Sequence, residues 1–233
     1  MKTVGILGGM GPEATILLMQ KLLAAVPARD DSDHIPLIVH QNPQVPSRIK
    51  ALIEGTGEDP GPTLARMARD LEAAGAQALA MPCNTAHHYA PTVVAATSLP
   101  FLNMLDLTAA ALVAQGARRI GMLASPATRL AGVFAAPFAA HGLTPVFLPD
   151  DSDLLTLIRA VKAGEVAASL KPRLTHEAEA LLAEGADHLL VACTELSLMT
   201  DALPRTAPHT DSLDCLTVAI ARFAQNGAPQ ERL

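Results

Sequence analysis

Short apolar runs alternate with stretches of helical character, and this alternation constrains the fold more than any other feature of the sequence. A helical stretch from about Pro12 to Val26 follows the first apolar run, with proline at a first helical position. The apolar runs occupy residues 3–9, 35–41, 77–82, 119–125, 143–149 and 188–193. Strands that alternate with helices form parallel sheets covered on both faces. The sequence therefore predicts an α/β fold.

Two segments about half a chain apart resemble each other. Residues 72–85, EAAGAQALAMPCNT, and residues 182–195, LAEGADHLLVACTE, both run from a helix end through Gly-Ala and an apolar strand to a cysteine. The two cysteines, Cys83 and Cys193, lie 193 − 83 = 110 positions apart. A cysteine at the end of the corresponding strand in both copies is much rarer by chance than similarity between two βαβ units. We therefore expect two pseudo-symmetric α/β lobes, each with one parallel sheet flanked by helices.

The predicted lobes comprise residues 1–105 and residues 106–209. A C-terminal helix at about residues 210–233 is expected to pack back on the first lobe. Ligands of open parallel sheets bind beyond the carboxyl ends of the strands, so the active site is expected in the cleft between the lobes.

Composition excludes several functional classes. Hydrophobic residues make up 50% of the chain and charged residues 17%, which is typical of a globular protein. A net charge of −6 offers no basic patch, so nucleic acid is not an expected partner. No apolar run reaches the roughly 18 residues of a membrane span, so no membrane partner is expected. Three widely spaced cysteines form no disulfide framework, which favours the reducing cytoplasm.

Cys83 and Cys193 are expected to approach one crevice from opposite sides. Each precedes a helix, whose N-terminus favours a thiolate. One thiolate could remove a proton from a carbon atom while the other thiol delivers a proton to the opposite face. This arrangement suggests racemisation or epimerisation without a cofactor. The competing interpretations are a packing role for each cysteine, or a metal site of Cys83 with His87, although no further ligands stand at motif spacing. Cys215, in an apolar helix, is expected to pack.

The glycine-rich start is open to two interpretations. Residues 9–14, GMGPEA, match the dinucleotide fingerprint G-x-G-x-x-A after a strand. The acidic residue that this fingerprint requires is missing, because the second strand ends in Gln41 and Asn42. Alternatively, the backbone N–H groups of Gly8 to Gly11 bind a small anion such as a carboxylate.

Five motifs together resemble the aspartate racemase branch of the aspartate/glutamate racemase family. They are GILGGMGPEAT, NPQVPSR, MPCNTAH, VKAG and VACTELS, and they span nearly the whole chain in the expected order. The resemblance implies two lobes related by pseudo-twofold symmetry, a homodimer, and cofactor-independent racemisation of an acidic amino acid, aspartate or glutamate. It also implies that Cys83 and Cys193 are the two catalytic residues. Ser125 stands where the family commonly has threonine.

The resemblance further implies nine substrate-binding residues and no metal site. They are Met10, Pro12, Asn42, Arg48, Asn84, Thr85, Ser125, Lys162 and Thr194. Asn84, Thr85 and Thr194 match positions that hold the α-carboxylate. Arg48 and Lys162 match the basic residues that hold the distal carboxylate. Arg48 lies in the long segment 42–62, which is rich in Gly and Pro and has one helical turn expected near residues 49–53. Loops of this length are often lids or binding loops.

Rival functions stay open. Hydantoin racemases, maleate isomerases and arylmalonate decarboxylases of the wider superfamily share the scaffold and reuse its cysteines, but Arg48 favours a free acidic amino acid. A non-catalytic small-molecule binding protein would need no pair of thiols. A cysteine hydrolase would combine one nucleophile with a base such as His87, and would leave Cys193 unexplained.

Overall fold

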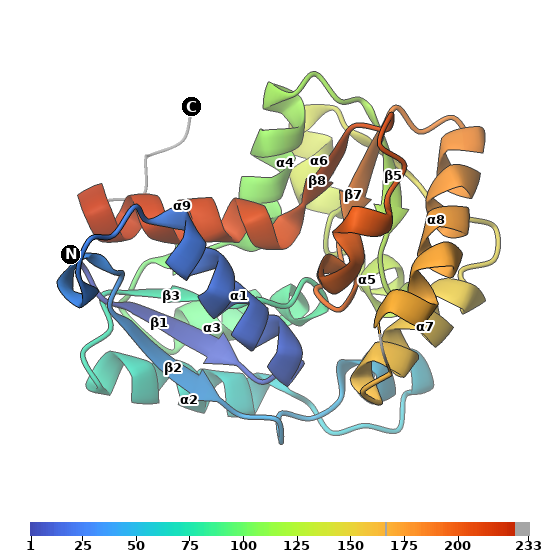
Figure 1. Cartoon of the computed structure of the whole chain (residues 1–233). Helices are drawn as coiled ribbons and strands as arrows, with labels where there is room; N and C mark the ends of the chain where they lie inside the picture. Colours follow the sequence, from blue (N-terminus) through green and yellow to red (C-terminus); the bar gives the residue numbers. More distant parts are fainter. Residues whose placement is uncertain (166, 227–233) are drawn as a thin grey trace.

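Strands form two parallel sheets with the same internal order (Figure 1). The computed structural model describes residues 1–165 and 167–226, and within these ranges each sheet has four strands. The first has the order β2-β1-β3-β4, with β1 (Val4–Gly8), β2 (Leu37–Gln41), β3 (Ala78–Ala80) and β4 (Phe101–Leu102). The second has the order β6-β5-β7-β8, with β5 (Arg119–Leu123), β6 (Thr144–Val146), β7 (His188–Val191) and β8 (His209–Asp211). The two orders are the same permutation, so the predicted two-lobed α/β fold is confirmed.

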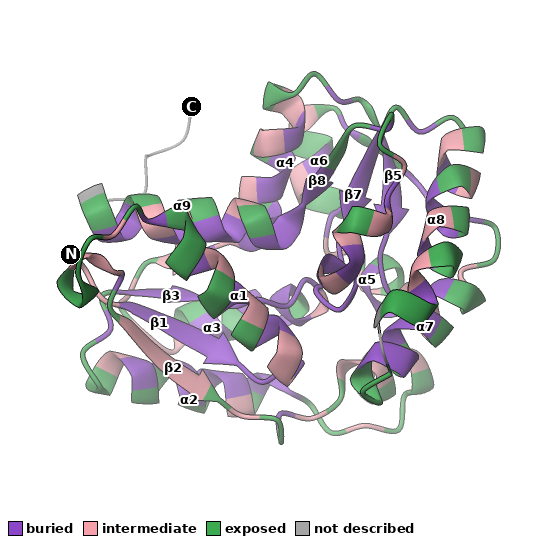
Figure 2. Cartoon of the chain, in the orientation of Figure 1, coloured by how far each residue is buried: buried purple, intermediate pink, exposed green. Residues whose placement is uncertain are grey.

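Helices cover both faces of each sheet. Central strands such as β1 and β7 are therefore buried along their whole length (Figure 2). The first sheet packs against α1 (Pro12–Ala25) and α9 (Ser212–Asn226) on one face, and against α2 (Gly61–Ala73) and α3 (Ala90–Ala95) on the other. The second sheet packs against α7 (Ser152–Lys162) and α8 (Ala167–Ala183), and against α4 (Met104–Ala114) and α6 (Ala135–His141). No helix within the described ranges is long and apolar enough to cross a membrane.

Shorter helical segments lie in the connections between these elements. They are α5 (Pro126–Leu130), η1 (Asp31–Asp33), η2 (Lys50–Glu54), η3 (Thr85–Tyr89) and η4 (Leu196–Ala202). The π-helical segment η2 stands where one helical turn was expected in the long loop. The three-residue strand β8 was not predicted, because it is too short to show a period.

The helices α4 and α9 are exchanged between the lobes. α4 follows β4 of the first sheet, yet its Leu105 and Leu112 pack in the core of the second sheet. α9 follows β8 of the second sheet, yet its Leu216 and Ile220 pack in the core of the first. The two helices also contact each other, and Figure 1 shows α9 running from the end of β8 across the first sheet. The exchange ties the lobes together.

The lobe boundaries at 105/106 and 209/210 stay a prediction. Residues 227–233 of the expected C-terminal helix lie outside the described residues.

The repeated architecture extends to how one glycine in each sheet is packed. A Cβ on Gly5 in β1 or on Gly121 in β5 would lie only 2.9–3.2 Å from three side chains, which belong to a covering helix, to the adjacent strand and to the turn between them. The neighbours are Leu71, Ala76 and Leu79 at Gly5, and Leu181, Ala186 and Leu189 at Gly121. The corresponding neighbours in the two lobes, 71 and 181, 76 and 186, and 79 and 189, lie 110 positions apart, the same offset as the two cysteines. Both glycines are therefore needed so that a helix can approach its sheet closely.

We predict that Gly5→Ala and Gly121→Ala each lower the free energy of unfolding by about 1–3 kcal/mol, because the added methyl group overpacks the contact. Urea denaturation followed by circular dichroism measures the change. Arg66→Ala, at an exposed position of α2, is the control and should stay within about 0.5 kcal/mol of the parent. Unchanged midpoints in both glycine variants would contradict the prediction.

Candidate active site

A cavity of about 340 Å³ lies between the lobes and is lined by residues of both. Ten of the eleven predicted site residues line it: Met10, Pro12, Arg48, Cys83, Asn84, Thr85, Ser125, Lys162, Cys193 and Thr194. The eleventh, Asn42, does not. Its side-chain oxygen accepts a hydrogen bond from the backbone N–H of Gln44 at 3.0 Å, and its side-chain nitrogen donates to Met67 Sδ at 3.8 Å. Asn42 thus shapes the loop after β2 instead of facing the cavity.

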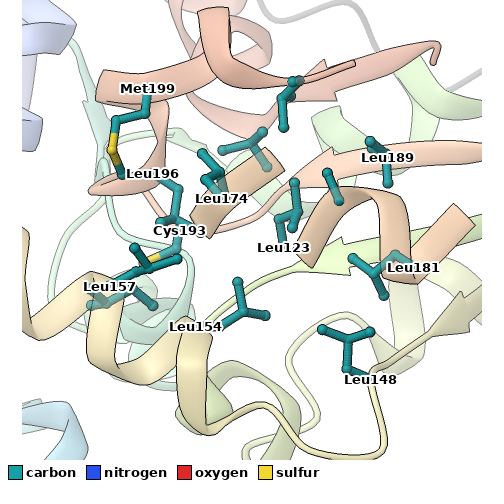
Figure 3. Close-up of a cluster of buried hydrophobic side chains, with 14 of the residues drawn as sticks. Leu123, Leu148, Leu154, Leu157, Leu174, Leu181, Leu189, Cys193, Leu196 and Met199 are labelled. Atoms are coloured by element: carbon teal, nitrogen blue, oxygen red, sulfur yellow. The ribbon is translucent and has the colours of Figure 1, made fainter. Parts of the chain in front are cut away.

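The two thiols lie at equivalent strand ends but have different surroundings. Cys83 and Cys193 are free, and each is 8% exposed. Figure 3 shows Cys193 among the leucine side chains of the second lobe, beside Leu157 and Leu196. Cys193 Sγ donates a hydrogen bond to Glu195 Oε2 at 3.0 Å. Burial, together with the Glu195 carboxylate, raises the pKa of Cys193 well above its ordinary value. Cys83 Sγ makes no hydrogen bond to any residue that the structure describes.

Glu195 is a cavity residue that the sequence analysis missed. It is only 4% exposed, and its second carboxylate oxygen pairs with Lys162 Nζ at the end of α7. The side chain of Lys162 is 34% exposed. Burial alone would lower the pKa of Lys162, but the charge of Glu195 and the hydrogen bond to it hold that pKa above its ordinary value. The signal in the sequence was a carboxylate two positions after a thiol.

Asn84 brings an unpaired acceptor to the cavity wall. Its Nδ2 donates to Ser212 Oγ at 2.9 Å, and Ser212 Oγ donates to the backbone oxygen of Val191 at 3.0 Å. A serine hydroxyl has one hydrogen, so the Asn84 atom bonded to it must be the donor nitrogen. The remaining atom, Asn84 Oδ1, is buried and has no hydrogen-bond partner in the part of the chain that the structure describes.

Three hydroxyl groups join the lobes beside the cavity. Thr85 Oγ1 lies 3.2 Å from Ser125 Oγ and 2.8 Å from Thr128 Oγ1, and these last two atoms are 3.1 Å apart. Thr128 was not predicted, although Ser125 caps α5 by accepting a hydrogen bond from its backbone N–H. The serine that precedes Pro126 is a preferred N-cap residue, and this cap places Thr128 beside Ser125. Thr194 adds a further link across the cleft, since its hydroxyl donates to the backbone oxygen of Pro82 at 3.4 Å.

The guanidinium group of Arg48 is hydrogen-bonded to its own loop through Nη1, whereas its Nε is unpaired in the described residues. Its Nη1 donates to the backbone oxygens of Val45 at 3.4 Å and Pro46 at 3.0 Å. Its Nε is buried without a hydrogen-bond partner within residues 1–165 and 167–226. On the outer side of the same loop, Glu54 lies 3.6 Å from Arg159 of α7, which links the loop to the second lobe.

His87 supports the backbone of Cys83. Its Nδ1 lies 2.8 Å from the Cys83 carbonyl oxygen, and the backbone N–H of Met104 donates to its Nε2 at 3.2 Å. Nε2 is therefore the acceptor, and Nδ1 carries the hydrogen that the ring donates to Cys83. Burial lowers the pKa of His87 to about 4, so the ring is neutral. Both ring nitrogens are occupied, and the structure forms neither the thiol–imidazole pair of a hydrolase nor a Cys83–His87 metal site.

Gly9 serves the packing of the loop after β2. It has φ +94°, and a Cβ there would lie 2.4 Å from the backbone carbon of Asn42. Its N–H donates to Thr15 Oγ1 at 2.9 Å. This N–H is therefore not free to bind a pyrophosphate or a small anion.

The similarity of this chain to known proteins extends over both lobes. Residues 7–221 match the family model described as Asp/Glu/Hydantoin racemase. The chain is 24% identical to the broad specificity amino-acid racemase RacX of Bacillus subtilis, over 91% of this chain and 94% of the relative. It is 31% identical to the glutamate racemase of Ectopseudomonas mendocina, over 70% of this chain and 62% of the relative. The solved structure of Picrophilus torridus aspartate racemase is similar with a TM-score of 0.84 and 30% identity, covering 97% of this chain and 95% of that chain.

We predict that His87 makes stability fall as the pH drops from 6.5 to about 4. Above pH 6.5 the ring is neutral in both states, whereas below it the unfolded chain binds a proton that the folded protein does not. The loss is on the order of 3 kcal/mol at about 1.4 kcal/mol per pKa unit. Urea denaturation across this range should show the stability gap between the parent and His87→Gln shrinking as the pH falls. A constant gap would contradict the prediction.

Proposed function

Because the chain belongs to the Asp/Glu/Hydantoin racemase family and is thus an isomerase, we propose that it racemises a free acidic amino acid, aspartate or glutamate. The family that its motifs predicted is confirmed. The observation that carries the proposal is a cavity lined by one thiol from each lobe and by Arg48.

The two thiols divide the proton transfer between the faces of the α-carbon. One, as thiolate, takes the α-proton, so that a C–H bond breaks and an S–H bond forms. The other, as thiol, gives its proton to the opposite face, so that an S–H bond breaks and a C–H bond forms. The reverse reaction uses Cys83 and Cys193 in exchanged roles. One proton is accepted and one is donated, so this scheme calls for no cofactor.

The α-substituents lie between the thiols in this proposal. We assign the unpaired Oδ1 of Asn84 to the α-ammonium group, because an acceptor suits a cationic donor. This revises the expectation that Asn84 holds the α-carboxylate. The hydroxyl groups of Thr85 and Thr194 remain for the α-carboxylate. The other predicted lining residues, Met10, Pro12 and Ser125, shape the wall.

The distal carboxylate is assigned to Arg48. The unpaired Nε and an adjacent Nη on the same edge of a guanidinium can donate two parallel hydrogen bonds to a carboxylate. Lys162 contributes less than the family resemblance implies, because its charge is balanced by Glu195.

A broader substrate range is a second candidate. The cavity is lined by two carboxylates, Glu13 and Glu195, as well as by the cations Arg48 and Lys162. This balance supplies no net positive charge, which favours acceptance of amino acids with uncharged side chains. One relative of the chain is named for broad specificity.

The homodimer and the cytoplasmic location stay predictions. Three apolar side chains on one face of α1 support the homodimer, since they are exposed to 50% at Ile16, 40% at Met19 and 57% at Leu23. An apolar surface stripe of this kind is typical of an interface between proteins.

We predict that Cys83→Ser and Cys193→Ser each lower the rate of racemisation by at least about a hundredfold, because a hydroxyl group is a much weaker acid and base than a thiol. Chiral chromatography of aspartate and glutamate measures inversion, and NMR in D2O measures α-proton exchange. Each variant should retain exchange of one enantiomer only, with opposite preferences. Cys215→Ser is the control and should keep the parent rate within about twofold. Inversion by Cys83→Ser at the parent rate would refute the two-thiol mechanism.

We predict that Arg48→Leu lowers kcat/KM for aspartate and glutamate by roughly a hundredfold, because a charge-assisted contact in a desolvated site is worth a few kcal/mol. Arg48→Lys should lose less, since it keeps the charge without the two-point geometry. Arg66→Leu, which removes an exposed arginine of α2 outside the cavity, is the matched control. If Arg48→Leu kept the parent preference for acidic over neutral amino acids, another group would have to bind the side chain.

A further inference from the structure

The pseudo-symmetry of the lobes breaks at the thiols. With the offset of 110 that relates Cys83 to Cys193, the position in the first lobe that corresponds to Glu195 is Thr85. Thr85 directs its hydroxyl toward Ser125 and Thr128. The second lobe therefore places a carboxylate beside its thiol where the first lobe has a neutral hydroxyl group.

The Glu195 carboxylate is fixed in this position. Oε2 accepts the hydrogen bond from Cys193 Sγ at 3.0 Å, and Oε1 accepts from Lys162 Nζ. Glu195 is almost fully buried, so turning away would leave its charge without a partner in a region of low dielectric. Lys162 thus anchors the carboxylate, and the carboxylate in turn contacts the thiol.

We propose that Glu195 is a positioning residue that keeps Cys193 protonated between turnovers, so that Cys83 is the thiol that begins a turnover as the base. This inference rests on the proposed function. Loss of the proton from Cys193 would place a thiolate against a carboxylate in the buried wall of the cavity, and like charges at that distance repel strongly. With the proton in place, the same two atoms share a hydrogen bond. The ammonium group of Lys162 offsets part of the repulsion but does not remove it, consistent with the raised pKa of Cys193.

The two enantiomers therefore meet different forms of the site. A turnover that begins at Cys83 ends with the proton on Cys83 and with a thiolate at Cys193, facing Glu195. This form is the less stable one, so the proton returns to Cys193 before the next turnover in the same direction. The enantiomer whose α-proton faces Cys83 binds to the resting form directly.

Alkylation of each thiol tests the inference without requiring turnover. The intact protein is treated with iodoacetamide at pH 7.5, and the labelling rates of Cys83 and Cys193 are followed separately by peptide mass spectrometry. Only a thiolate reacts, so Cys83 should react faster than Cys193 in the parent. Glu195→Gln should raise the rate at Cys193 by at least about threefold, the net gain per pKa unit once the lower nucleophilicity of a more acidic thiol is included. Lys162→Met should lower the rate at Cys193.

Two controls make the outcome specific to Glu195. Glu13→Gln removes another carboxylate of the same cavity, one that makes no hydrogen bond to Cys193, and should change the Cys193 rate by less than about twofold. The Cys83 rate in each variant serves as an internal control for loosening of the fold.

The inference is overturned if the Cys193 rate is unchanged in Glu195→Gln, or if both thiols accelerate together. A change of the Cys193 rate in the same direction in Glu195→Gln and Lys162→Met also overturns it. These results are independent of the proposed function, which fails if the cysteine-to-serine variants still racemise.

Discussion

The exchange of α4 and α9 between the lobes is the constraint on which the rest of the structure depends. Each helix follows the last strand of one sheet and buries its apolar face against the other sheet. Neither core can be completed without chain from the other lobe. The lobes are therefore fixed relative to each other, and the carboxyl ends of β3 and β7 remain on opposite sides of one cavity. A reaction that needs a thiol on each face of one carbon requires a fixed separation of this kind.

Hydrogen bonds between polar groups across the cleft also hold the two lobes together. The hydroxyl groups of Thr85, Ser125 and Thr128 connect the lobes, and Thr194 bonds to the backbone before Cys83. His87 connects the same backbone to the start of α4, so the exchanged helix also positions a thiol. The contacts that hold the lobes together are thus the contacts that orient the site.

Charge in the cavity is arranged in pairs. Glu195 pairs with Lys162 and accepts a hydrogen bond from Cys193, so one carboxylate contacts both a cation and a thiol of the cavity. Arg48, whose Nε has no hydrogen-bond partner among the described residues, is the cation that we propose binds a carboxylate. A net charge of −6 over the whole chain gives no indication of this local arrangement.

The sequence by itself determined the α/β class, the repetition of one unit and the place of both cysteines, because these depend on local pattern. A residue that follows a buried parallel strand lies at the ligand-binding edge in whatever way the rest of the chain packs. Only the tertiary structure decided the partners of those residues. Asn42 stands at a strand end and yet turns into its own loop, while Lys162 and Glu195 meet although 33 positions separate them. Pairs within a lobe, such as Lys162 with Glu195, depend on how the helices of that lobe pack on its sheet. Pairs across the cleft, such as Thr85 with Ser125 and Thr128, depend on how the lobes face each other, and that follows from the burial of the two exchanged helices.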